Sequence, residues 1–119
     1  MTTIAPGLVP LYGLTEDHLA FRDVIREIVA ARVAPRAAAI DASGEFPEDV
    51  RRLFADHDIF GLPFDEAHGG TGTGALVLCV AIEEVAKACA SSSLLLAVQD
   101  LGSLPLRLPA SRMPTSCSP

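Results

Sequence analysis

The chain has 119 residues, 50% of them hydrophobic, with 9 lysines and arginines against 15 acidic residues and a net charge of -6. This length fits one ordinary domain with a modest core and leaves no room for a second domain. The negative charge disfavours nucleic acid and anionic lipid as partners, and no apolar run approaches the roughly 20 residues of a membrane span. Because the N-terminus lacks a basic segment leading into an apolar stretch, we expect a soluble, cytoplasmic protein.

The three cysteines, Cys79, Cys89 and Cys117, are odd in number and lack the CxxC spacing of zinc sites. We therefore expect neither a disulfide framework nor a metal site. Cys79 and Cys89 are interpreted as buried thiols.

Residues 1–13 mix proline, glycine and apolar residues without a period and are interpreted as an irregular N-terminal arm. A helix is predicted after Thr15, which can cap the first amides, while Glu16 and Asp17 suit the positive end of the helix dipole. Pro35 should end or kink this helix, and residues 41–45 should turn the chain. Spacing by three and four predicts an inward face of Phe21, Val24, Ile25, Ile28 and Val29, with Arg22, Asp23, Arg26 and Glu27 in solvent.

Pro47 fits the first position of a second helix with Val50, Leu53 and Phe54 inward, and Gly61 ends that segment. After a glycine-rich loop, residues 75–90 are apolar around most of the circumference, which is typical of a central helix. The serines at 91–93 should cap a fourth helix over residues 94–106, bent by Pro105 near its end. The pattern predicts an all-α fold, a helical bundle of about four main helices.

The glycine-rich loop has a second interpretation. As Gly70-x-Gly72-x-x-Ala75 it fits the loose dinucleotide-binding fingerprint, with strands at 59–64 and 94–98 and Asp100 as the ribose ligand. The segment 65–68 separates the first strand from the glycines, however, and its two acids would repel a pyrophosphate. A dinucleotide-binding βαβ unit is therefore the remote alternative.

Five motifs in register resemble the N-terminal helical domain of acyl-CoA dehydrogenases. They are Leu14-Thr15-Glu16, the turn at 41–47, Gly61-Leu62-Pro63, His68-Gly69-Gly70-Thr71-Gly72 and Glu83-Glu84-Val85-Ala86. The match covers residues 14–106, and His68 stands where the family usually has Tyr, Cys or Phe. The resemblance implies an FAD-dependent flavoenzyme that oxidises acyl-CoA to its 2,3-enoyl form in fatty acid β-oxidation and assembles as a homo-oligomer, a tetramer or dimer. In that family the flavin and the catalytic Glu belong mainly to a middle β-domain and a C-terminal helical domain.

By the same resemblance, the fourth helix forms part of the acyl-chain pocket, with core packing as an equal alternative. The residues implied are Leu94, Leu95, Ala97, Val98, Leu101 and Gly102. We assign no catalytic residue, no metal ligand and no flavin-binding residue. Because neighbours on a helix point about 100° apart, Glu83 and Glu84 do not share a site. We expect one of them to be solvated or paired with an arginine and the other to cap a neighbouring loop. His18, His57 and His68 are interpreted as solvated.

The resemblance stops at Arg107, where arginine, proline and serine without a helical period replace the family pattern. We interpret residues 107–119 as a non-family, disordered tail, of the kind that a shifted reading frame produces. The hypothesis is a truncated or frameshifted chain that retains no FAD, lacks a complete active site and is inactive alone. The competing hypothesis is a stand-alone helical interaction module that buries its apolar third and fourth helices against a partner.

Overall fold

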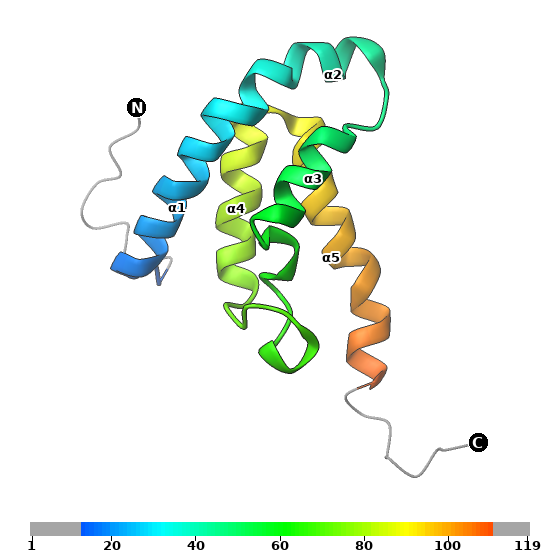
Figure 1. Ribbon diagram of the computed structural model, residues 1–119. Coiled ribbons are helices and arrows are strands. Elements are labelled where there is room, and N and C mark those ends of the chain that lie inside the picture. Colours follow the sequence, from blue (N-terminus) through cyan, green and yellow to red (C-terminus); the bar gives the residue numbers. More distant parts are fainter. Residues whose placement is uncertain (1–12, 111–119) are drawn as a thin grey trace.

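A computed structural model describes residues 13–110 of the chain, and side chains from residue 13 to residue 107. All regular secondary structure in this part is helical, which confirms the predicted all-α class. Figure 1 shows α1, α4 and α5 standing next to one another, α3 over α4 and α5, and α2 crossing one end. The bounds are Glu16–Ile28 for α1, Ala37–Ser43 for α2, Glu48–Asp56 for α3, Ala75–Ala88 for α4 and Ala90–Ala110 for α5.

The N-terminus of α1 is closed by a reciprocal cap. The Thr15 hydroxyl oxygen accepts from the His18 amide at 3.3 Å, and His18 Nδ1 accepts from the Thr15 amide at 3.1 Å. The predicted helix start is therefore confirmed, with His18 adding a contact that the sequence did not indicate.

Pro35 changes the type of helix and does not end it. A π-helical turn at Val29–Val33 and a 3-10 turn at Ala34–Arg36 join α1 directly to α2. Proline lacks an amide and its ring crowds the carbonyl four residues earlier, so a wider turn ahead of it relieves the clash. The reversal expected from Asp41 begins only at Gly44, which has a φ of 65°.

The inward face predicted for α1 is correct except at Val24. Ile25 and Val29 are buried, Phe21 and Ile28 are half-buried, and Val24 is 54% exposed. Val24 lies about 100° around the helix from Ile25, outside the stripe that meets α4. In α3 the expected inward residues are all buried, and the Phe54 ring centre lies 6.0 Å from that of Phe60.

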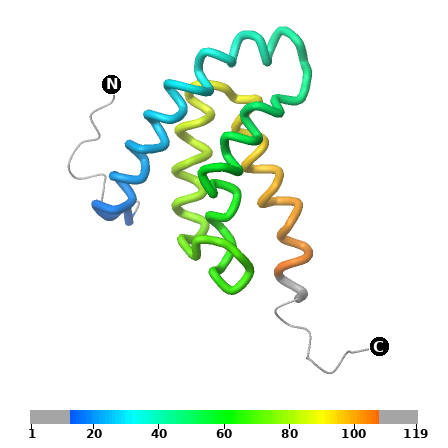
Figure 2. The backbone as a smooth tube through the Cα atoms, in the orientation of Figure 1, coloured from blue at the N-terminus to red at the C-terminus, as the bar shows by residue number. Residues whose placement is uncertain are grey.

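As predicted, α4 is central, because it packs against both α1 and α5 (Figure 2). It still keeps an exposed stripe at steps of three and four, made by Leu76, Cys79, Glu83 and Ala86. The prediction that Cys79 is buried is therefore wrong, whereas Cys89 is buried as expected and Cys117 lies outside the described residues. The core draws on every α-helix: Ile25, Val29, Val33, Ile40, Val50, Leu53, Phe54, Ile59, Leu62, Val77, Leu78, Ala81, Val85, Cys89 and Leu96.

The last helix is longer at both ends than predicted. Only Cys89, with an extended backbone (φ -153°, ψ 104°), separates α4 from α5, so the serines expected as a cap lie inside the first turn. In that turn the Ser93 hydroxyl donates to the Ala90 carbonyl at 2.6 Å. At the other end α5 runs through Ala110, so the non-helical character predicted from Arg107 onward is wrong for residues 107–110. The arm at 1–12 and residues 111–119 lie outside the described part.

Candidate functional site

The backbone amides of the glycine-rich loop are occupied by hydrogen bonds to the residues just before it. Between the 3-10 turns Ile59–Gly61 and Glu66–His68 and the start of α4, four amides of the loop bond to carbonyls of the preceding turn at 2.8–3.1 Å. These bonds run from Gly70 to Asp65, Thr71 to Gly61, Gly72 to Phe64 and Gly74 to Leu62. A phosphate site needs such amides to be free and convergent. The βαβ alternative is therefore wrong, and its two expected strands are a 3-10 turn with its following residues and a stretch of α5.

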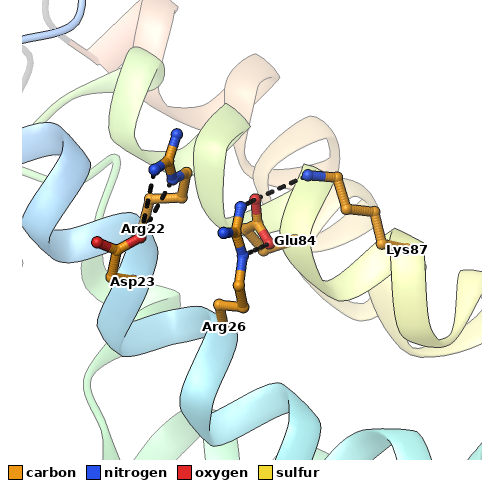
Figure 3. A network of polar contacts seen from close by, with 5 residues as sticks. All are labelled: Arg22, Asp23, Arg26, Glu84 and Lys87. Atoms are coloured by element: carbon orange, nitrogen blue, oxygen red, sulfur yellow. Dashed lines mark hydrogen bonds and ion pairs between the residues drawn. The ribbon is translucent and has the colours of Figure 1, made fainter. Parts of the chain in front are cut away.

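Glu84 is a buried acidic residue, with only 4% of its surface exposed. Its carboxylate accepts from Arg26 Nε and Nη2, each at 3.0 Å, and from Lys87 Nζ at 2.9 Å (Figure 3). The hydrogen bond from Arg26 lowers the pKa of Glu84, against the opposing effect of burial, and Lys87 adds to the lowering. The carboxylate is thus ionised and fully engaged in joining α1 to α4, which makes it a poor proton acceptor.

The ion pairs of Glu84 test the expectation for the adjacent residues Glu83 and Glu84. The pairing of one glutamate with an arginine is confirmed, and Arg26, expected in solvent, is the partner. Glu83 is exposed, and the hydrogen bonds of the described residues include no loop cap from it.

The three histidines serve local structure. Beyond the cap at His18, His57 Nδ1 lies 2.9 Å from the Leu53 carbonyl, and His68 Nδ1 lies 2.7 Å from Asp65 Oδ1. His57 and His68 are on the surface as expected, whereas His18 is half-buried. Within residues 13–110 no group of His, Cys, Asp and Glu could hold a metal ion.

An apolar groove of about 610 Å³ lies between the start of α3 and the first half of α5. It is lined by Phe46, Pro47, Arg51, Phe60, Ser91, Leu94, Leu95, Val98 and Gln99. The one charged side chain in this lining, Arg51, is held by Glu48, whose Oε2 accepts from Arg51 Nε at 2.8 Å. The groove therefore offers apolar contact and no carboxylate.

Three of the six residues implied for the acyl pocket line this groove, namely Leu94, Leu95 and Val98. Leu101 lies further along α5 and is 66% exposed, Gly102 is exposed, and Ala97 is half-buried. Sequence reasoning did not identify Phe46, which is 62% exposed at the groove. The phenylalanine preceding Pro47 in a turn was the available signal.

Arg107 fastens α5 to the turn before the glycine-rich loop. Its guanidinium pairs with the Asp100 carboxylate, donates from Nη1 to the Pro63 carbonyl at 3.3 Å, and lies 4.7 Å from the centre of the Phe64 ring. This residue, expected to begin a disordered tail, is therefore part of the packed domain.

The described residues thus form an all-helical domain whose polar clusters are engaged in structure and whose open site is apolar. Residues 15–111 match the family described as "Acyl-CoA dehydrogenase, N-terminal domain". The chain belongs to this family. No helix within residues 13–110 has the length and apolar character needed to cross a membrane.

The chain is also similar in sequence to part of several longer proteins that are named as acyl-CoA or related dehydrogenases. The chain is 41% identical over 93 residues to the cyclohexane-1-carbonyl-CoA dehydrogenase of Syntrophus aciditrophicus, covering 77% of this chain and 24% of that protein. It is 39% identical over 93 residues to the cyclohex-1-ene-1-carbonyl-CoA dehydrogenase of Geobacter metallireducens, covering 78% and 24%. A probable acyl-CoA dehydrogenase of Bacillus subtilis is 33% identical over 96 residues, covering 80% and 25%. The chain therefore spans about a quarter of the length of these relatives.

Proposed function

We propose that this chain supplies the N-terminal helical domain of an FAD-dependent acyl-CoA dehydrogenase acting in fatty acid β-oxidation. In this proposal the groove and the exposed face of α5 form part of the wall around the acyl chain. The observation that carries it is the placement of Leu94, Leu95 and Val98 in an apolar groove free of carboxylates. Such a surface suits a hydrocarbon chain, which gains by leaving water and needs no polar partner.

The chemistry itself must come from outside the described residues. Removal of the proton next to the thioester needs a carboxylate that can accept it, and a flavin takes the hydride. Glu84 is engaged by Arg26 and Lys87, and Asp100 is paired with Arg107. The bonded amides of the glycine-rich loop also do not fit a flavin pyrophosphate. We therefore propose that the chain alone retains no FAD and is inactive. We also propose that it acts within a cytoplasmic homo-oligomer.

The side chains at the groove favour compact acyl groups. Leu94, Leu95 and Val98 are branched, and Phe46 and Phe60 line the same groove, so these side chains occupy space that a long chain would need. Two of the relatives are named for six-membered cyclic acyl-CoA substrates. We extend that class of substrate to the enzyme in which this domain functions.

A chimera tests this proposal. Residues 15–111 replace the matching segment of the Syntrophus aciditrophicus enzyme, and flavin content and reduction of an artificial acceptor by cyclohexane-1-carbonyl-CoA are measured. We expect a flavin-containing, active chimera, whereas the 119-residue chain alone shows neither property. In the chimera, Val98→Phe should lower kcat/KM about tenfold by crowding the acyl group, while Leu76→Ala, on the exposed stripe of α4, leaves kcat/KM unchanged.

Two results would contradict the proposal. A folded chimera without flavin would show that the domain does not replace its counterpart. An active chimera in which Val98→Phe and Leu76→Ala have equal kcat/KM would show that the groove is not the acyl wall.

A further inference from the structure

The bundle leaves a large apolar residue of α1 open. Val24 is 54% exposed, and Phe21 and Ile28, at steps of three and four from it, are half-buried against the core. These three residues are here called the α1 stripe. Arg26, which joins α1 to α4, lies about 200° around the helix from Val24, so α4 does not cover the stripe.

An apolar segment of the same chain directly precedes α1. Residues 1–12 contain no charged side chain, and their large apolar side chains include Ile4, Leu8, Val9, Leu11 and Tyr12. In water such a segment gains by placing these side chains against an apolar surface. The chemistry of this segment therefore matches that of the α1 stripe.

Two prolines favour an extended path for the segment. Pro6 and Pro10 lack an amide, and each disfavours helical angles at the residue before it, which is Ala5 in one case and Val9 in the other. An extended backbone that lacks two amides leaves fewer unpaired donors when it lies against a helix.

Gly13 allows the chain to turn back at the start of α1. Its φ of 65° is left-handed, and this conformation changes the direction of the chain just before Thr15 caps the helix. A segment that folds back from Gly13 runs along α1 in the opposite direction.

The lengths of helix and segment agree with such a path. Phe21 and Val24 lie eight and eleven residues after Gly13, which places them about 12 and 17 Å along the axis at about 1.5 Å per residue. An extended, proline-rich chain covers about 3.1 Å per residue, so these distances take about four and five residues. Counted back from Gly13, those residues are Val9 and Leu8.

We propose that residues 8–12 fold back along α1 and cover the α1 stripe, with Val9 over Phe21 and Leu8 over Val24. The segment then acts as a strap over the apolar side chain of α1 that the bundle leaves open. This inference does not depend on the proposed enzymatic role, because the groove lies between α3 and α5.

Alkylation of a thiol introduced by Val24→Cys tests the proposal in the full 119-residue chain. The rate of reaction with N-ethylmaleimide is measured at position 24 by peptide mass spectrometry, relative to the native Cys79, which is exposed on α4. Adding Leu8→Asp and Val9→Asp should raise this relative rate about tenfold, as expected if the strap is closed about nine-tenths of the time. Thr2→Asp and Thr3→Asp are the matched control, because they add the same charge to the same segment beyond the proposed contact.

The proposal is overturned if the relative rate at position 24 is the same in all three chains, because the segment then does not cover Val24. It is also overturned if the two pairs of substitutions raise the rate equally, since apolar contact by Leu8 and Val9 is then not the cause. The chimera begins at residue 15 and lacks the segment, so neither result bears on it.

Discussion

Gly70 lies so close to the preceding turn that only hydrogen fits in place of a side chain. A Cβ atom added there would stand 2.1 Å from the Phe64 carbonyl oxygen and 2.4 Å from its carbon. Those are backbone atoms, which cannot move aside without breaking the bond between the Gly72 amide and the Phe64 carbonyl. The glycine is therefore required for close packing of two backbone segments.

Gly70→Ala should lower the free energy of unfolding by about 2 kcal/mol or more, as overpacking does elsewhere. Gly102→Ala is the control, since nothing lies within 4 Å of a Cβ added there. Alanine within a helix should raise stability by about 0.5–1 kcal/mol. Urea denaturation measures both changes, and equal effects at the two positions would show that the contact with Phe64 is not limiting.

At the scale of single residues, the sequence predicts those features that depend on residues close together in the chain. The Thr15 cap and the inward faces of α1 and α3 follow from local spacing, apart from Val24. The pairing of Arg26 with Glu84 spans 58 positions in the chain, and no local pattern reports which arginine meets which glutamate. The exposure of Phe46 likewise depends on how the turn before α3 lies against α5.

The helices α1, α3, α4 and α5 were predicted, whereas α2 and the ends of α5 were not. The run of serines resembles a cap, whereas the actual break is the extended backbone of Cys89, a residue type that carries no strong preference for ending a helix. Pro35 was expected to end or kink a helix, but a π-helical turn ahead of it relieves the steric clash that normally stops one. Near its end, α5 is joined by Arg107 to Pro63 and Phe64, which lie in a distant segment of the chain.

Arg107→Ala should loosen the last turns of α5 while leaving the rest of the bundle intact. The variant removes the pair with Asp100, the bond to the Pro63 carbonyl and the stacking on Phe64. Hydrogen exchange of amides at 101–107 should quicken about tenfold, as expected for local opening made about 1.4 kcal/mol easier. Arg52→Ala, on an arginine that is 73% exposed, should leave these amides unchanged. Unchanged exchange in Arg107→Ala would show that packing on α4 alone holds this end.

The bundle as a whole depends on acidic groups that favour their charged forms. Glu48, Asp49, Asp65 and Glu84 all have a lowered pKa in the folded protein, each chiefly through a hydrogen bond from a basic side chain. Because the unfolded chain keeps the ordinary pKa values, it binds more protons as the solution is acidified. The stabilisation is complete above the ordinary pKa and is lost as pH falls through the folded value. The three exposed groups contribute little, so Glu84 should dominate this dependence.

Glu84→Gln tests this at neutral and acidic pH. At pH 7 the free energy of unfolding should fall by about 1–3 kcal/mol, because Arg26 and Lys87 lose their shared carboxylate. Below pH 4.5, the usual pKa of a glutamate, the difference from the wild type should shrink. Glu83→Gln, an exposed change one residue away, should follow the wild type throughout. A difference between Glu84→Gln and the wild type that stays constant on acidification would mean that charge is not the source of the stabilisation.

At the scale of the molecule, the fold class and the family could be predicted, because both rest on the order and distance of motifs along the chain. The groove could be predicted only in part. Leu94, Leu95 and Val98 were implied by the family resemblance, whereas Phe46 and Phe60 reach the groove from turns whose paths the sequence does not specify.

Because only Cys89 separates α4 from α5, its backbone angles set the direction in which α5 leaves α4. At about 1.5 Å per residue, a helix of this length extends about 30 Å, so each change of about 10° at its pivot moves the far end by about 5 Å. The groove lies near the pivot and Leu101 lies further along the helix, so small changes in the backbone of Cys89 are magnified along the exposed face of the helix. Arg107 holds the helix at its far end. The direction of that face is therefore set by the backbone of Cys89, by packing on α4 and by the contacts of Arg107.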